Sequence, residues 1–81
     1  AEAQLGGNNV LPELERHLIL HQQNLKIYQT IFAKDFADGH AQDRTQFIHK
    51  MILQLGIDLE MGWIKWLETM IPQLKAFEDK T

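Results

Sequence analysis

The apolar residues of this chain recur at alternating spacings of three and four, a pattern typical of amphipathic helices with a heptad seam. The pattern starts beside Pro12, which suits the first turn of a helix because its missing N–H would have no partner there. It stops at the turn signal Asp38-Gly39 and resumes after Asp43, a residue type that favours helix N-caps. The sequence therefore predicts an all-α fold: a linker or flexible tail over 1–11, then a helical dimerisation domain over 12–79 with helices at about 12–37 and 43–77.

The first predicted helix is apolar on two sides. Its main seam runs through Leu11, Leu14, Leu18, His21, Leu25, Tyr28 and Phe32. A second group, Leu20, Ile27 and Ile31, lies roughly 130° around the helix at 100° per residue. A single antiparallel partner leaves this second group uncovered.

The second predicted helix has a narrow polar stripe of Lys50, Gln54, Asp58, Lys65 and Glu68. One apolar group contains Ile48, Met51, Ile52, Leu55, Leu59, Trp63, Trp66 and Met70, and a neighbouring group contains Leu53, Ile57, Ile64, Leu67 and Ile71. Together they cover about two thirds of the circumference, whereas one helical neighbour covers a stripe of little more than about 100°. We therefore expect the hairpin to form a homodimeric, coiled-coil-like helical bundle.

The expected dimer interface takes residues from both apolar groups and both helices. Gly62 lies on the apolar side, where a missing side chain lets another helix approach closely. The interface candidates are Leu18, Leu25, Tyr28, Phe32, Leu55, Leu59, Gly62, Trp63, Ile64, Trp66, Leu67 and Ile71.

Composition and charge narrow the range of functions. With 44% hydrophobic residues the chain has a folding composition, and 8 Lys and Arg against 11 Asp and Glu give a net charge of −3. An acidic balance disfavours direct DNA binding, because contacts to phosphate need Lys or Arg. No apolar run approaches the roughly 20 residues that cross a bilayer, and no leader is visible, so we expect a soluble cytoplasmic chain without membrane contact. Its first residue, Ala1, fits either methionine removal or a fragment of a longer protein.

Little in the sequence points to catalysis, a cofactor or a metal site. Neither Cys nor Ser occurs, so the common Ser/His and Cys/His nucleophiles are absent, and we expect no enzyme activity and no cofactor. His17 and His21 share one side of a helix and could clamp a transition metal, but no third ligand completes the site. His21 takes a seam position, which favours a polar residue that sets the register of a helical interface.

Two tryptophans form the one candidate ligand surface. Trp63 and Trp66 are three residues apart on one side of the second predicted helix, beside Leu59 and Met70. They could stack against a small, flat aromatic effector in the cleft of a dimer. Ordinary packing of the two indoles is the alternative.

The sequence resembles the C-terminal part of PadR-like transcriptional regulators, the group that includes the virulence-activator regulators. In that family the last helix begins with Leu-Gly and ends its aromatic- and acid-rich stretch with Trp-hydrophobe-Glu, matched here by Leu55-Gly56 and Trp66-Leu67-Glu68. The segment from Leu14 to Phe36 is similar to the family's other long C-terminal helix, and the resemblance covers residues 13–74. It implies a dimerisation domain whose regulator contacts DNA only through an N-terminal winged-helix domain, which this sequence lacks.

Three functions remain open at this point. The resemblance favours a C-terminal dimerisation domain of a PadR-like regulator. A second function is a sensing module that binds a planar aromatic effector at Trp63 and Trp66. A third is a free-standing helical adaptor that binds a helix of another protein through its uncovered face.

Overall fold

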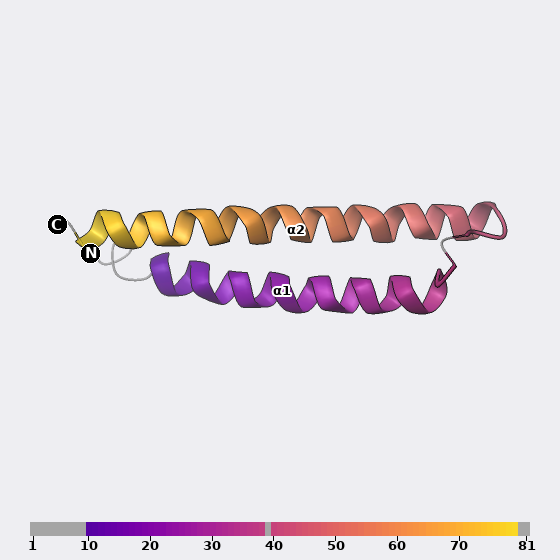
Figure 1. Cartoon of the computed structure of the whole chain (residues 1–81), viewed down its shortest axis with the longest axis horizontal. Coiled ribbons are helices and arrows are strands. Elements are labelled where there is room, and N and C mark those ends of the chain that lie inside the picture. Colours follow the sequence, from indigo (N-terminus) through magenta and orange to yellow (C-terminus); the bar gives the residue numbers. More distant parts are fainter. Residues whose placement is uncertain (1–9, 39, 80–81) are drawn as a thin grey trace.

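The computed structural model describes residues 10–38 and 40–79, which form two antiparallel helices and the connection between them. Helix α1 spans Val10–Asp35 and helix α2 spans Arg44–Asp79. They lie side by side, and α2 extends beyond α1 at both ends (Figure 1). The molecule is a rod of 57 × 22 × 14 Å. The predicted all-α hairpin is confirmed.

The helix bounds differ from the expected ones by a few residues. Helix α1 starts at Val10, inside the segment expected to be a tail, and residues 1–9 of that segment lie outside the described residues. It ends at Asp35 rather than near residue 37, and the next residue, Phe36, still donates its backbone N–H to Phe32 O at 2.8 Å. The Phe36 side chain is 4% exposed, and its ring lies edge-on to His49 with the centroids 5.7 Å apart. This contact closes the connected end of the hairpin.

Side-chain hydrogen bonds shape the connection between the helices. The backbone N–H of Gln46 donates to Asp43 Oδ1 at 2.8 Å, which confirms Asp43 as the N-cap of α2. The Gln46 side-chain oxygen in turn accepts the N–H of Gln42 at 2.7 Å. Asp38 Oδ1 accepts the N–H of His40 at 3.0 Å, and this hydrogen bond lowers the pKa of Asp38. These side chains thus satisfy the backbone N–H of Gln46 in the first turn of α2 and those of His40 and Gln42 in the connection.

The core lies along the line where α2 faces α1. Apart from Phe36, its buried residues belong to α2, whereas α1 contributes half-buried side chains. The positions of α2 that face α1 follow the heptad spacing, and we call them the inner seam: Leu53, Ile57, Glu60, Ile64, Leu67 and Ile71. One of the two predicted apolar groups of α2 therefore packs within the chain.

Candidate functional site

The other apolar group of α2 is exposed to solvent. Its heptad positions form a second line, which we call the outer seam: Ile48, Ile52, Leu55, Leu59, Gly62 and Trp66. The large apolar side chains of this seam, together with the flanking Met51 and Trp63, are 37–62% exposed. At 100° per residue the two seams lie roughly 140° apart on the helix. Helix α1 covers the inner seam and leaves the outer seam open.

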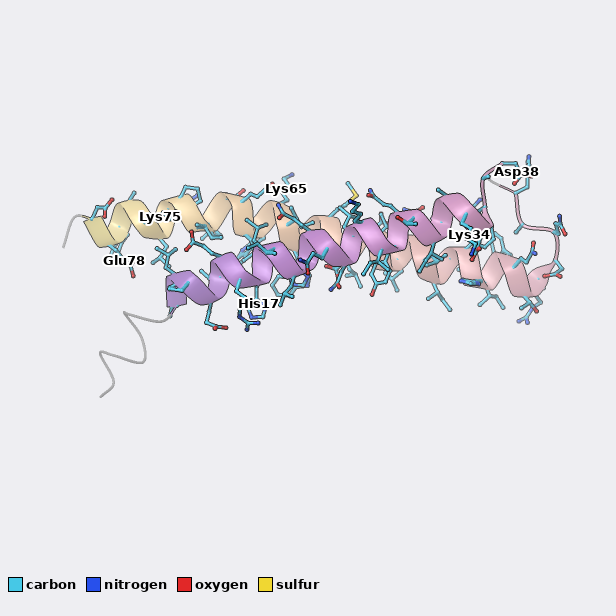
Figure 2. All side chains as sticks on the ribbon, turned by 90° about the horizontal axis from the view of Figure 1, so that it is seen from below. His17, Lys34, Asp38, Lys65, Lys75 and Glu78 are labelled. Carbon is cyan, nitrogen blue, oxygen red and sulfur yellow. The ribbon has the colours of Figure 1, made fainter. Side chains whose placement is uncertain are left out.

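The outer seam lies on the same broad side of the hairpin as exposed apolar residues of α1. Figure 2 shows His17 and Lys65 pointing to opposite edges of the rod. Leu20 and Ile27 follow His17 at helical spacing on α1, and both are exposed. Trp63 lies on this same side, because it lines a groove together with His17. This side is the more apolar one, although Ile19, Phe47 and Met61 are exposed elsewhere on the hairpin.

A polar pair interrupts the apolar contact between the two helices. His21 Nδ1 lies 2.5 Å from Glu60 Oε2, and the two side chains are only 19% and 12% exposed. The two side chains share a hydrogen bond across the helix contact. The imidazole also stacks on the indole of Trp63, with centroids 5.3 Å apart and planes within 4°. The expectation that His21 is a polar seam residue is confirmed, and Glu60 is the partner that periodicity alone did not reveal.

A groove of about 480 Å³ lies beside this pair. Its walls come from both helices: Leu14, His17, His21, Trp63, Trp66 and Leu67. The indoles of Trp63 and Trp66 are nearly perpendicular, with an interplanar angle of 87° and centroids 6.3 Å apart. A flat ligand can therefore stack on one of these indoles but not on both at once.

The two glycines of α2 have different surroundings. A Cβ on Gly56 would lie 3.2 Å from Cε2 of Tyr28, so the Tyr28 ring occupies the space that a side chain would need. A Cβ on Gly62 would meet no atom within 4 Å. Packing within the hairpin accounts for Gly56 but does not account for Gly62.

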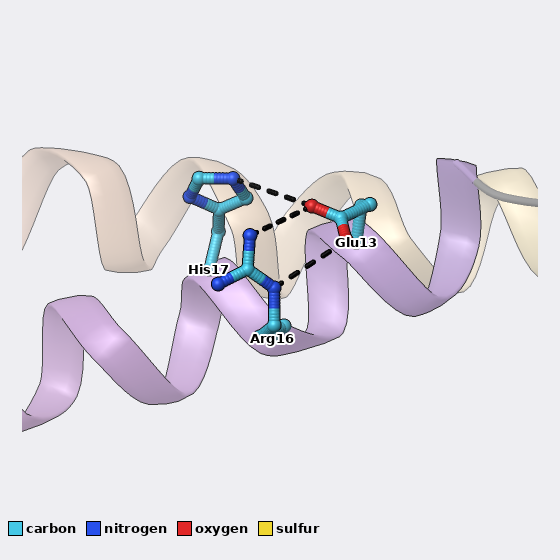
Figure 3. A network of polar contacts seen from close by, with 3 residues as sticks. All are labelled: Glu13, Arg16 and His17. Carbon is cyan, nitrogen blue, oxygen red and sulfur yellow. Dashed lines mark hydrogen bonds and ion pairs between the residues drawn. The ribbon is translucent and has the colours of Figure 1, made fainter.

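A charged network stands on the first turns of α1 (Figure 3). Arg16 donates to Glu13 at 2.8 Å, and this hydrogen bond lowers the pKa of Glu13 below its usual value. His17 Nε2 lies 3.9 Å from Glu13 Oε2. Glu13 is therefore a carboxylate at helical spacing beside His17, which the search for a third ligand in the sequence missed. Within residues 10–38 and 40–79, however, no three His, Asp or Glu side chains are placed to hold a metal ion.

The structure divides the twelve interface candidates into two sets. Leu18, Leu25, Tyr28, Phe32, Ile64, Leu67 and Ile71 are buried or half-buried where the two helices meet. Their burial is accounted for within one chain. The other candidates are exposed to solvent on the apolar side: Leu55, Leu59, Gly62, Trp63 and Trp66. The same surface continues through Ile48, Met51 and Ile52.

The fold thus defines a helical hairpin domain with an open apolar side. Neither of the two described helices combines the length and apolar character needed to span a membrane. Residues 1–75 match the model of the family Virulence activator alpha C-term, so the chain belongs to this family of C-terminal regulator domains. No curated protein and no solved structure matches the sequence.

Proposed function

We propose that this chain is the dimerisation domain of a PadR-like transcriptional regulator that works in the cytoplasm. DNA is contacted by an N-terminal winged-helix domain, and the hairpin holds two such domains together. The proposal gives the hairpin no catalytic role. The observation that carries it is the exposed outer seam, which repeats the heptad spacing of the seam that packs against α1.

The energy of covering this surface supports self-association. Full burial of a large apolar side chain stabilises by about 1.5–3 kcal/mol, so burying the remaining exposed half yields about 1 kcal/mol per residue. The exposed large apolar residues of the outer seam and its two flanks number seven in each copy: Ile48, Met51, Ile52, Leu55, Leu59, Trp63 and Trp66. A contiguous apolar surface of this kind marks an interaction site, whereas single exposed apolar residues are ordinary.

Sedimentation equilibrium at micromolar concentration tests the proposal. We expect a dimer for the parent chain, and a monomeric or unfolded chain for Leu59→Lys because a charge then stands in the buried interface. Met61→Lys is the matched control: Met61 is 52% exposed and Leu59 56%, but Met61 lies on the polar side of the same helix. A folded monomer of the parent chain at high micromolar concentration contradicts the proposal, as does a Leu59→Lys variant that stays dimeric.

A second function is supported by the groove beside Trp63. We propose that a planar aromatic effector binds there, against one indole and the two imidazoles of His17 and His21. Titration with a panel of planar aromatic compounds should quench tryptophan fluorescence, because Trp63 and Trp66 are the only indoles. Unchanged fluorescence with every compound, at concentrations that saturate typical small-molecule sites, contradicts this second function.

A further inference from the structure

Gly62 indicates where a second copy of the chain can pack closely against the outer seam. Glycine weakens a helix interior, so its presence in the middle of α2 calls for a reason. Gly56 has one in the Tyr28 ring, but the space around Gly62 is open. Leu59 and Trp66 stand on either side of Gly62 along the outer seam, and both are about half exposed. The seam therefore presents a gap between two large side chains, which can receive a side chain of an approaching helix.

Two opposite charges border the outer seam on its polar edge. Asp58 and Lys65 are one heptad apart, so they lie at equivalent positions beside the seam. Both are exposed, and Asp58 also accepts a hydrogen bond from Gln54 at 3.0 Å. When two copies of one helix pack antiparallel, this edge of one copy faces the same edge of the other. The charges then select among the registers that the apolar seam allows.

Three antiparallel registers, each one heptad apart, keep the middle of the seam in contact. One sets Asp58 against Asp58 of the second copy, and another sets Lys65 against Lys65. Repulsion between like charges disfavours both of these registers. The register between them sets Asp58 against Lys65 twice, once on each side of the two-fold axis. A parallel arrangement sets Asp58 opposite Trp63 and Lys65 opposite Met70, with no opposite charge.

The register favoured by charge also determines which side chains meet across the seam. It brings Leu59 of each copy onto Gly62 of the other, so the gap in the seam receives a leucine. It also brings Leu55 opposite Trp66 and Ile52 opposite Thr69. The two shifted registers likewise place a large side chain, Ile52 or Trp66, on Gly62, so the charges select the register and side-chain size does not.

We propose that a second copy of this chain lies antiparallel along α2 in this register, with Leu59 packed on Gly62 and Asp58 facing Lys65. The inference rests on the proposed dimerisation and adds its geometry. The charges choose the register, while the apolar seam supplies most of the affinity.

Disulfide trapping tests this geometry directly, because the chain contains no cysteine of its own. Ile52→Cys mixed with Thr69→Cys should give the disulfide-linked heterodimer, since these positions face each other in the proposed register. A heterodimer of Ile52→Cys with Gly62→Cys or with Ala76→Cys reports the two shifted registers. Ile52→Cys linked to itself reports a parallel pair. Met61→Cys, on the polar side, is the control for random collision.

The outcomes separate the geometry from dimerisation itself. Dominant linkage of positions 52 and 69 supports the proposal. Dominant linkage in any other combination, or a dimer by sedimentation that none of these pairs traps above the Met61→Cys level, overturns the geometry and leaves dimerisation standing. A parent chain that sediments as a monomer overturns both.

Charge reversal gives an independent test without cysteine. Asp58→Lys alone places Lys opposite Lys twice and should raise the dimer dissociation constant about tenfold. Lys65→Asp alone should do the same through two Asp pairs, whereas a mixture of the two variants restores attraction on both sides. An unchanged dissociation constant in both single variants contradicts the proposed facing of these residues.

Discussion

The half-buried pair of His21 and Glu60 predicts a specific pattern of mutant stabilities. Removing one partner leaves the other in a largely apolar seam without its hydrogen bond, which costs about 1–3 kcal/mol for a polar group of this burial. We therefore expect His21→Leu and Glu60→Leu each to destabilise the hairpin by about this amount. The double variant places two leucines at facing seam positions, and replacement of a buried polar pair by apolar residues is close to neutral or stabilising.

The quantity to measure is the coupling energy of this double-mutant cycle. Urea unfolding followed by far-UV circular dichroism gives the four free energies, at one fixed chain concentration because dimerisation contributes to apparent stability. The expected coupling is about 2 kcal/mol or more, the sum of the two single losses. The matched control is the exposed pair of Glu13 and Arg16, whose cycle should show a much smaller coupling because water screens the two charges. Additive losses in the His21 and Glu60 cycle refute the view that these residues act as a pair.

Three further predictions follow from other parts of the hairpin. Gly56→Ala should stabilise the hairpin by less than the about 1 kcal/mol that alanine normally adds to a helix relative to glycine, because Tyr28 already fills that space. Gly62→Ala should instead weaken dimerisation while raising helicity. Sedimentation measures the change in dimerisation, and circular dichroism measures the change in helicity. Glu13→Gln should slightly destabilise the hairpin near neutral pH, where Glu13 is ionised and accepts the hydrogen bond of Arg16. The difference should vanish as the pH falls through the lowered pKa of Glu13, because stability from a depressed carboxylate pKa is lost on protonation. Urea unfolding at a series of acidic pH values shows whether the two stability curves converge. The chain alone should not bind duplex DNA measurably at physiological salt, since its net charge is −3; micromolar affinity with a steep salt dependence, measured by fluorescence anisotropy, contradicts this expectation.

The sequence predicted the hairpin but not which side of α2 faces α1. Heptad spacing marks both seams of α2 equally well, and Glu60 makes the inner seam look interrupted. The choice depends on contacts between the helices: His21 with Glu60, 39 residues away, and Tyr28 with Gly56. Periodicity within one helix carries no information about such pairs. The Asp43 cap could be predicted because its hydrogen bond to Gln46 is local.

The register of the proposed dimer also determines how far apart the starts of the two α1 helices lie. Glu15, near the start of α1, pairs with Lys75 at 3.2 Å, so this end of α1 is level with the last turns of α2. The proposed two-fold axis passes near Glu60 and Met61, and at 1.5 Å per residue the two Glu15 levels lie about 40–45 Å apart along the rod.

Each one-heptad shift of the register changes this separation by about 10 Å, which is seven residues at 1.5 Å each. Recognition helices of a dimeric regulator must reach half-sites about 34–36 Å apart, one turn of DNA, or a multiple of that distance. A shift of about 10 Å is therefore large enough to move a winged-helix domain off its half-site. In the proposed regulator, Asp58 and Lys65 therefore set the spacing of the two proposed winged-helix domains, although they contribute little to affinity.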